Sequence, residues 1–202
     1  MRQELALYYS SVRRADDCLG AVLQALKKSG DWDNTMLVFL SDHGMPLPFA
    51  KTQLYHHSTR TPLMVRIPGV TKAGKVDKQH MVSVLDLLPT VLDTLKIEKP
   101  NRLDGRSFYP LLKGEKREGW DYVIKQYHEN SGRSRDPMRA IQTKTHLYLF
   151  NPWSNGERVF ATATNGTVTC KRMIALAEED EEMNQRLELY RFRVPQELYQ
   201  VK

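Results

Sequence analysis

The sequence predicts an α/β fold followed by a smaller α+β part built on an antiparallel sheet. A long amphipathic helix precedes a continuous apolar run of strand length, which is the order typical of an α/β layer. Beyond Glu98 the pattern changes to short strands at 122–127, 138–143 and 146–150. We therefore expect two parts, an α/β part at residues 1–97 and a C-terminal subdomain at residues 98–202.

Composition and charge exclude several classes of protein. With 202 residues, 41% of them hydrophobic and 27% charged, the chain has the composition of a globular protein rather than a disordered one. Two cysteines exclude a disulfide scaffold, and no apolar run has the length of a membrane span. The formal net charge of +6 favours an anionic partner, without distinguishing nucleic acid, sulfated glycan and lipid headgroup. The first residues do not resemble a signal peptide, which leaves the compartment open.

The elements of the first part follow from periodicity and from turn residues. Apolar residues recur every seven positions from Leu5 to Leu26, which predicts a helix over 4–28 that ends at Gly30. Residues 36–40 form an unbroken apolar run, the pattern of a central parallel strand that is covered on both faces. A second strand is predicted at 62–67, and a helix at 86–95 after a capping-box spacing between Ser83 and Asp86.

The subdomain is predicted to hold a small antiparallel sheet and one helix. Strands 138–143 and 146–150 are separated by Lys144 and Thr145, a spacing that predicts a hairpin. Residues 171–190 are rich in helix-forming residues, with an acidic run at their centre. Near the end of the chain, Leu198 and Tyr199 have the pattern of a packed strand.

Asp42 and His43 directly follow the first predicted strand and are the most informative pair in the sequence. Open α/β sheets bind ligands at the carboxyl ends of their strands, and a carboxylate beside an imidazole suits a divalent metal. The alternative is that Asp42 caps a turn and His43 is a surface residue. Two adjacent ligands do not complete a metal site.

Three further groups could bind an anion or transfer a proton. Lys51 could contact phosphate or sulfate as a point charge, and His57 belongs to a Tyr-His-His run at 55–57 that could donate a proton. His128 and Glu129 end a predicted strand and precede an arginine-bearing loop that could contact acidic groups on a substrate. Each could equally be a solvated loop residue. Five basic residues could form an RNA-contacting patch, but the interleaved aromatic motif of such patches is missing, so we expect no nucleic-acid partner: Arg133, Arg135, Arg139, Lys144 and Arg172.

These separate signals occur in one order that resembles the sulfatase family of the alkaline-phosphatase-like superfamily. The motifs are the helix with Asp16-Asp17, Ser-Asp-His-Gly at 41–44, Lys51, Tyr55, Arg-Thr-Pro-Leu-Met-Val at 60–65 and Asp-Leu-Leu-Pro-Thr at 86–90. Later residues, from His128-Glu129 to Asn-Pro-Trp at 151–153, are most similar to the heparan N-sulfatase (sulfamidase) branch. The resemblance implies the later part of an alkaline-phosphatase-like α/β core, followed by its C-terminal subdomain.

The resemblance also implies roles for individual residues. Asp42 and His43 would be metal ligands, for calcium in most of the family, although the imidazole suits manganese or zinc better. Lys51 would contact the sulfate group, and His57 or His128 would protonate the leaving group. The expected substrate is a sulfated sugar or glycosaminoglycan, with substrate contacts from Lys51, Tyr55, His128, Glu129 and Arg133. Members of the family are secreted, periplasmic or lysosomal.

One departure from the family pattern limits the expected activity. The family nucleophile is a formylglycine made within a Cys/Ser-x-Pro-x-Arg motif, and no such motif occurs in this sequence. We therefore expect a C-terminal portion of a sulfatase, inactive by itself, that pairs with the missing half or dimerises. Two alternatives stay open: a phosphoryl-transfer enzyme of the same superfamily, and a non-catalytic basic module that binds sulfated glycan or nucleic acid.

Overall fold

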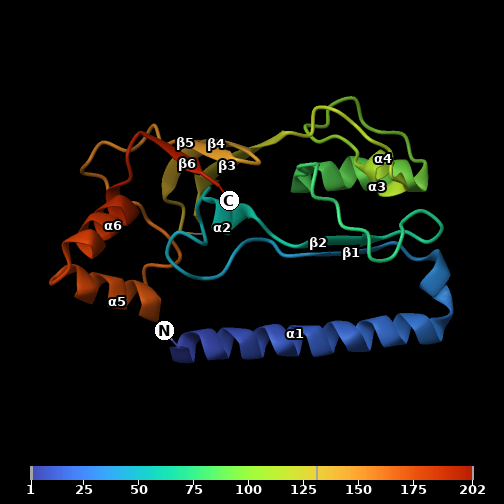
Figure 1. The fold of residues 1–202 in the computed structure, drawn as a ribbon, viewed down its shortest axis with the longest axis horizontal. Coiled ribbons are helices and arrows are strands. Elements are labelled where there is room, and N and C mark those ends of the chain that lie inside the picture. The colour runs from blue at the N-terminus through green and yellow to red at the C-terminus, as the bar shows by residue number, and fades with distance from the viewer. Residues whose placement is uncertain (1, 131, 202) are drawn as a thin grey trace.

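A computed structural model of the protein describes residues 2–130 and 132–201. The helices and strands are arranged as a long helix, a two-stranded ribbon, a pair of short helices and a four-stranded sheet with two helices at its end (Figure 1). In chain order they are α1 (Arg2–Ser29), η1 (Asp31–Asn34), β1 (Leu37–Leu40), α2 (His56–Thr59), β2 (Leu63–Arg66), η2 (Val84–Asp86), α3 (Leu87–Leu95), α4 (Tyr109–Lys113), β3 (Tyr122–Glu129), β4 (Arg135–Thr143), β5 (His146–Phe150), α5 (Val168–Ala177), α6 (Glu181–Phe192) and β6 (Gln196–Gln200).

Helix α1 confirms the predicted first helix and runs along one side of the molecule (Figure 1). No residue of α1 is buried, and Leu7, Val12 and Val22 of its apolar residues are exposed to solvent. An amphipathic helix normally buries its apolar stripe against another element, so this stripe is an unpartnered surface within the described residues. None of the described helices has the length and apolarity needed to cross a membrane.

The predicted strand at 36–40 is present as β1, but the interpretation of its pairing as parallel is wrong. Strand β1 pairs antiparallel with β2, in the register Leu37 to Arg66 and Leu40 to Leu63. Hydrophobic content does not encode strand direction, which here follows from the path of residues 41–62 between the two strands. Phe39 and Leu40 are 41% and 39% exposed, so the ribbon is not covered on both faces.

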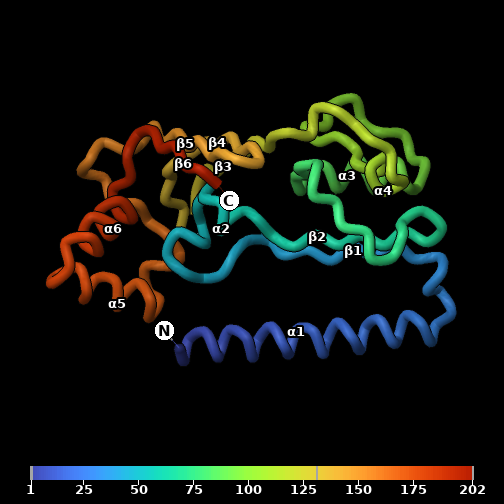
Figure 2. Tube along the Cα trace, viewed as in Figure 1, coloured from blue at the N-terminus to red at the C-terminus, as the bar shows by residue number. Residues whose placement is uncertain are grey.

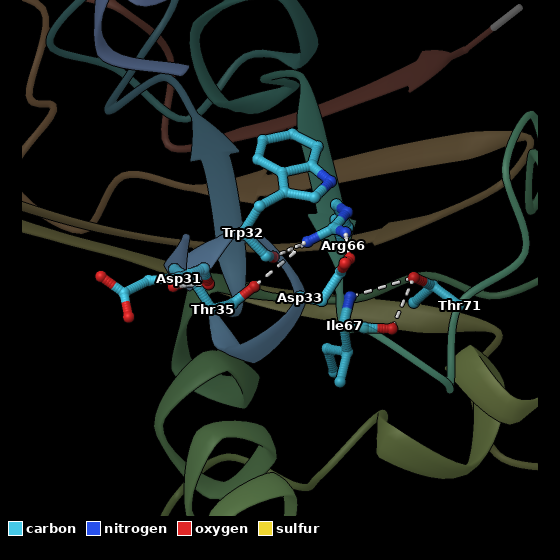
Figure 3. Close-up of polar contacts among 7 residues, drawn as sticks. All are labelled: Asp31, Trp32, Asp33, Thr35, Arg66, Ile67 and Thr71. Carbon is cyan, nitrogen blue, oxygen red and sulfur yellow. Dashed lines mark hydrogen bonds and ion pairs between the residues drawn. The ribbon is translucent and has the colours of Figure 1, made fainter. Parts of the chain in front are cut away.

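Arg66 fastens the start of the ribbon to the turn that follows α1. Its guanidinium donates hydrogen bonds to the carbonyl oxygen of Trp32 at 2.7 Å and to the carboxylate of Asp33 at 3.1 Å (Figure 3). The same guanidinium lies 4.1 Å from the centroid of the Trp32 ring. Directly after β2, the Thr71 hydroxyl closes a turn by accepting a hydrogen bond from the backbone amide of Ile67 at 2.9 Å (Figure 3).

The predicted helix at 86–95 is confirmed as η2 followed by α3. The capping box is present, because Ser83 accepts from the start of η2 while Asp86 accepts from the amide of Ser83 at 2.8 Å. Thr90, fully buried, accepts a hydrogen bond from the amide of Phe108 at 2.9 Å. Through such contacts the segment after α3 packs back on it, with a core cluster of Phe108, Leu111 and Trp120.

Strands β3 to β6 form one antiparallel sheet in chain order, which confirms the predicted strands and hairpin. Alternate residues of β4 are buried and face a core that contains Met138, Ala140, Leu147, Leu149 and Phe160. The last strand, β6, pairs with β5, as the red trace in Figure 2 shows. The sheet contacts α2 through hydrogen bonds to His56 and Thr59, and Leu54, before α2, belongs to the same core with Tyr55 packed against it.

The single helix predicted at 171–190 is wrong, because the segment forms two helices. Helix α5 ends at Ala177 and α6 begins at Glu181, with Asp180 as its N-cap accepting from the amide of Met183 at 3.0 Å. A carboxylate that accepts from the backbone of the next turn starts a new helix rather than continuing the old one. The break lets both helices contribute to one cluster, which includes Met173 and Tyr190.

Candidate functional site

The loop after β1 presents Asp42 and His43 side by side. The Asp42 carboxylate lies 3.1 Å from Nε2 of His43 and also accepts from the His43 amide at 2.9 Å. The other ring nitrogen of His43, Nδ1, lies 2.9 Å from the carbonyl oxygen of Gly44. Asp42 is largely exposed and His43 is half-buried, so the pair is open to a ligand from solvent.

Gly44 holds this loop against α2. Its amide donates to the carbonyl oxygen of Ser58 at 3.1 Å, and a Cβ at this position would lie 2.0 Å from the carbonyl oxygen of His57. Only glycine permits so close an approach of two backbone segments. The position of α2 therefore sets the position of Asp42 and His43.

A cleft of about 1080 Å³ opens in front of this loop, between α1 and residues 39–50. Its walls are largely apolar, with Val12 and Leu19 from α1 facing Phe39, Leu47 and Phe49. The polar side chains on its lining are Tyr8, Asp16, Ser41, Asp42, His43, His57, Arg60 and Arg186. The cleft thus joins the predicted metal ligands to a predicted proton donor, with two arginines beside them.

His56 and His57 occupy different environments although they are adjacent in sequence. His57 is exposed and lines the cleft. His56 points to the four-stranded sheet, where its Nδ1 lies 2.7 Å from the side-chain nitrogen Nε2 of Gln142. Burial lowers the pKa of His56 below the usual value for histidine. Of the two imidazoles, His57 lines the cleft and His56 does not.

Lys51 and Tyr55 lie beside the cleft but do not line it. Lys51 is half-buried, in a segment where Phe49 and Thr52 both have positive φ, at 64° and 61°. The Tyr55 hydroxyl donates to the Glu197 carboxylate and accepts from Arg193 at 2.8 Å. Burial raises the pKa of Tyr55 far above its usual range, although Arg193 opposes the shift. Tyr55 is therefore engaged in an internal network.

His128, Glu129 and Arg133 lie at the β3–β4 hairpin, and none of them lines the cleft. All three side chains are exposed, and Glu129 forms an ion pair with Arg135 at 3.3 Å. The hairpin is therefore an open, charged surface within the described residues. The structure brings Asp42, His43 and His57 together on the cleft. It places His128, Glu129 and Arg133 outside the cleft.

Two arginines on the cleft were not predicted as site residues. Arg60 lies in the motif at 60–65, so its position was visible in the sequence although its role was not. Arg186 comes from α6, and no local pattern connects it to the loop at 39–50. Its guanidinium lies 4.8 Å from the centroid of the Phe49 ring, a stacking contact that only the tertiary fold creates.

The described residues do not form a complete metal site. A calcium ion takes six to eight oxygen ligands, whereas this loop offers one carboxylate and one imidazole. Both ring nitrogens of His43 face oxygen atoms, so a metal would have to displace one of these contacts. In residues 2–130 and 132–201, no group of three or more His, Cys, Asp or Glu side chains is arranged to hold an ion.

Comparisons with known proteins find sulfatases and related hydrolases. The family model described as Sulfatase matches residues 1–97. N-sulphoglucosamine sulphohydrolase from Homo sapiens is 35% identical over 159 residues, covering 74% of this chain and 31% of that protein. A solved complex of a protein with its substrate D-glucosamine-2-N,6-O-disulfate matches at 26% identity and a TM-score of 0.58, covering 88% of this chain and 38% of the other. Phosphonate monoester hydrolase of Agrobacterium radiobacter matches at 25% identity and a TM-score of 0.57, covering 85% and 39%.

The chain corresponds to only part of each relative that it matches. The chain spans about a third of the length of the curated sulphohydrolase it matches, and less than half of either solved structure. The similarity to the solved structures extends beyond residue 97, since it covers more than four fifths of this chain.

Proposed function

Residues 1–97 belong to the sulfatase family of the alkaline-phosphatase-like superfamily, and on this premise we propose that the chain supplies part of the active site of a hydrolase of sulfated sugars. The family is one of hydrolases and generally uses a divalent metal. The finer proposal is that the bond cleaved is a sulfate ester or sulfamate on an amino sugar. The relative that acts on N-sulphoglucosamine and the solved complex with a disulfated glucosamine support this choice of substrate.

The observation that carries the proposal is the placement of Asp42, His43 and His57 on one cleft. Asp42 and His43 would supply two of the metal's ligands. The remaining ligands and the formylglycine nucleophile would come from sequence that the relatives carry outside the matched region. His57, which is exposed on the same cleft, would give a proton to the departing oxygen or nitrogen.

The other predicted residues receive roles that follow from their positions. Lys51, beside the cleft, would neutralise sulfate oxygens as a point charge. His128, Glu129 and Arg133 would contact a more distant part of an extended sugar chain, because they lie on the exposed hairpin outside the cleft. Tyr55 would hold the Lys51 segment rather than touch substrate, since Glu197 and Arg193 already bind its hydroxyl.

The proposal has a two-step test. The first step is to read the genomic DNA upstream of the Met1 codon for an in-frame Cys/Ser-x-Pro-x-Arg motif. The second is to measure sulfate release from N-sulfated glucosamine by the protein expressed from the whole reading frame. Asp42→Asn keeps the shape of the side chain and removes its charge, so kcat/KM should fall about 100-fold or more.

The matched control is Lys144→Met, which removes an exposed charge from the β4–β5 turn and should leave the rate unchanged. A reading frame without the nucleophile motif would overturn the proposal. Full activity of the Asp42→Asn protein would remove Asp42 from the site.

A second candidate function is phosphonate or phosphate ester hydrolysis in the same superfamily. The similarity to a phosphonate monoester hydrolase favours it, at nearly the same TM-score as the sulfated-sugar complex. The same protein is assayed with a phosphonate monoester in place of the sulfated sugar. Faster release from the phosphonate, by kcat/KM, would replace the sulfatase proposal with this one.

A further inference from the structure

A lysine lies between the four-stranded sheet and α2, away from the cleft. Lys125 faces inward from β3, and its Nζ donates to Thr59 Oγ1 at 2.5 Å and to the carbonyl oxygen of Leu54 at 3.4 Å. It also donates to the side-chain oxygen of Gln142 on β4. One ammonium group thereby joins both ends of the segment that carries α2 to two strands of the sheet.

Gln142 extends the connection to His56, at the start of α2. Its side-chain nitrogen lies 2.7 Å from Nδ1 of His56, while its oxygen accepts from Lys125. Gln142 is buried, so both ends of its amide need partners within the protein. The two side chains therefore hold α2 at His56 and Thr59, and they also hold Leu54, the residue before its N-cap.

Stability alone does not account for a charge at this position. None of the ion pairs among the described residues includes Lys125, and burial lowers its pKa to about 8. Taking an ammonium out of water without a carboxylate partner costs free energy that hydrogen bonds to neutral oxygens only partly offset. Lys125 contributes to the geometry of this region, because its three acceptors come from three separate places: Leu54 just before α2, Thr59 in α2 and Gln142 in β4.

The other side of α2 holds the loop of the candidate site. The carbonyl oxygen of Ser58 accepts from the Gly44 amide, and the backbone of His57 leaves no room for a side chain at Gly44. A shift of α2 would therefore move the loop that carries Asp42 and His43.

We infer that Lys125 is a positioning residue, through which the C-terminal sheet fixes α2 and thereby the placement of His57 and of the Asp42–His43 loop. The inference rests on the proposed function only for the use of that loop. The mechanical link from Lys125 to Gly44 is independent of any activity. By this inference the C-terminal subdomain helps to shape the site, although Lys125 does not line the cleft.

The test is hydrogen exchange of the full chain, read by mass spectrometry on peptides that cover residues 41–50 and 54–60. In Lys125→Met, the unbranched apolar side chain keeps most of the length of lysine and removes its donors. Exchange in both peptides should become about tenfold faster, because the bond from Gly44 to Ser58 opens more often. Peptides from the β4–β5 hairpin should keep their wild-type rates.

Two further variants make the result specific. Lys144→Met removes a lysine at the turn of the same sheet and should change neither peptide. Thr59→Val keeps Lys125 and removes one acceptor, so it should speed exchange in the same two peptides by a smaller factor, about threefold. Thr59→Val also serves where Lys125→Met does not fold.

Unchanged exchange at 41–50 in both Lys125→Met and Thr59→Val would overturn the inference. Equal acceleration in every peptide would also overturn it, since Lys125 would then be an ordinary contributor to stability. Sulfate release plays no part in this readout. Hydrogen exchange therefore tests the inference and sulfate release tests the proposed function, so that the failure of one can be distinguished from the failure of the other.

Discussion

The charge on Lys125 predicts an unusual dependence of stability on pH. In the folded chain its pKa is lowered to about 8 from 10.5 by burial. Between these two values the unfolded chain keeps the proton and the folded chain has lost it. The free energy of unfolding therefore rises as pH increases from 8 towards 10, and below pH 8 this contribution is constant.

The magnitude follows from the width of this interval. Two pH units correspond to about 2.7 kcal/mol for a fully buried group. Lys125 is only partly buried, so solvent reduces the expected gain to about 1–2 kcal/mol. The interval ends near pH 10, because burial raises the pKa of Tyr127 and of Tyr199 to about 12. Above pH 10 these phenols keep protons that the unfolded chain loses, which lowers stability again.

The assay is urea unfolding of the wild type and of Lys125→Met at pH 7.5, 8, 9 and 10, followed by tryptophan fluorescence. The difference in unfolding free energy between the two proteins removes the contributions of all other titrating groups. This difference should shift in favour of the wild type by about 1–2 kcal/mol between pH 8 and 10. A difference that stays flat, or that shifts towards the variant, would refute the assignment of a lowered pKa to Lys125.

Three other substitutions test the internal packing of the chain, two of them at or beside the site. Gly44→Ala places a Cβ 2.0 Å from one backbone carbonyl oxygen and 2.6 Å from another, so thermal unfolding should show a loss of about 3 kcal/mol, whereas Gly20→Ala, in an open part of α1, should stabilise slightly. Thr90→Val leaves the buried amide of Phe108 without its acceptor and should cost about 1–3 kcal/mol in urea unfolding; no change would mean that another acceptor replaces it. Tyr55→Phe removes the hydroxyl shared by a buried carboxylate and a buried arginine, and calorimetry should show a loss of about 1–3 kcal/mol; an unchanged transition temperature would argue that the two charged groups pair directly.

Local patterns in the sequence predict most of the elements. The seven-residue recurrence from Leu5 to Leu26, the capping box at Ser83 and the two-residue gap at Lys144 are all contained within a few turns of chain. Such signals depend on backbone geometry and on the alternation of buried and exposed faces. Both are determined by residues that are close together in the sequence. The Asp42–His43 pair was found for the same reason, because it directly follows β1.

Two predictions were wrong because the sequence pattern did not reveal the feature that determines the structure. The acidic run at 178–182 has high helix propensity, which concealed the N-cap at Asp180 that divides the helix. The direction of β1 relative to β2 depends on the path of the chain between them, and the apolar content of each strand is the same in either direction.

The surroundings of the site depend on residues far apart in the chain. Arg186 reaches the cleft from α6, Glu197 binds the hydroxyl of Tyr55 from β6, and Lys125 holds α2 from β3. The sequence alone was sufficient for the family, most of the longer elements and the candidate metal-ligand pair, because these are encoded in short segments. The fold was needed to show which side chains share a cleft and which are consumed in internal hydrogen bonds, since those contacts form only when distant segments pack together.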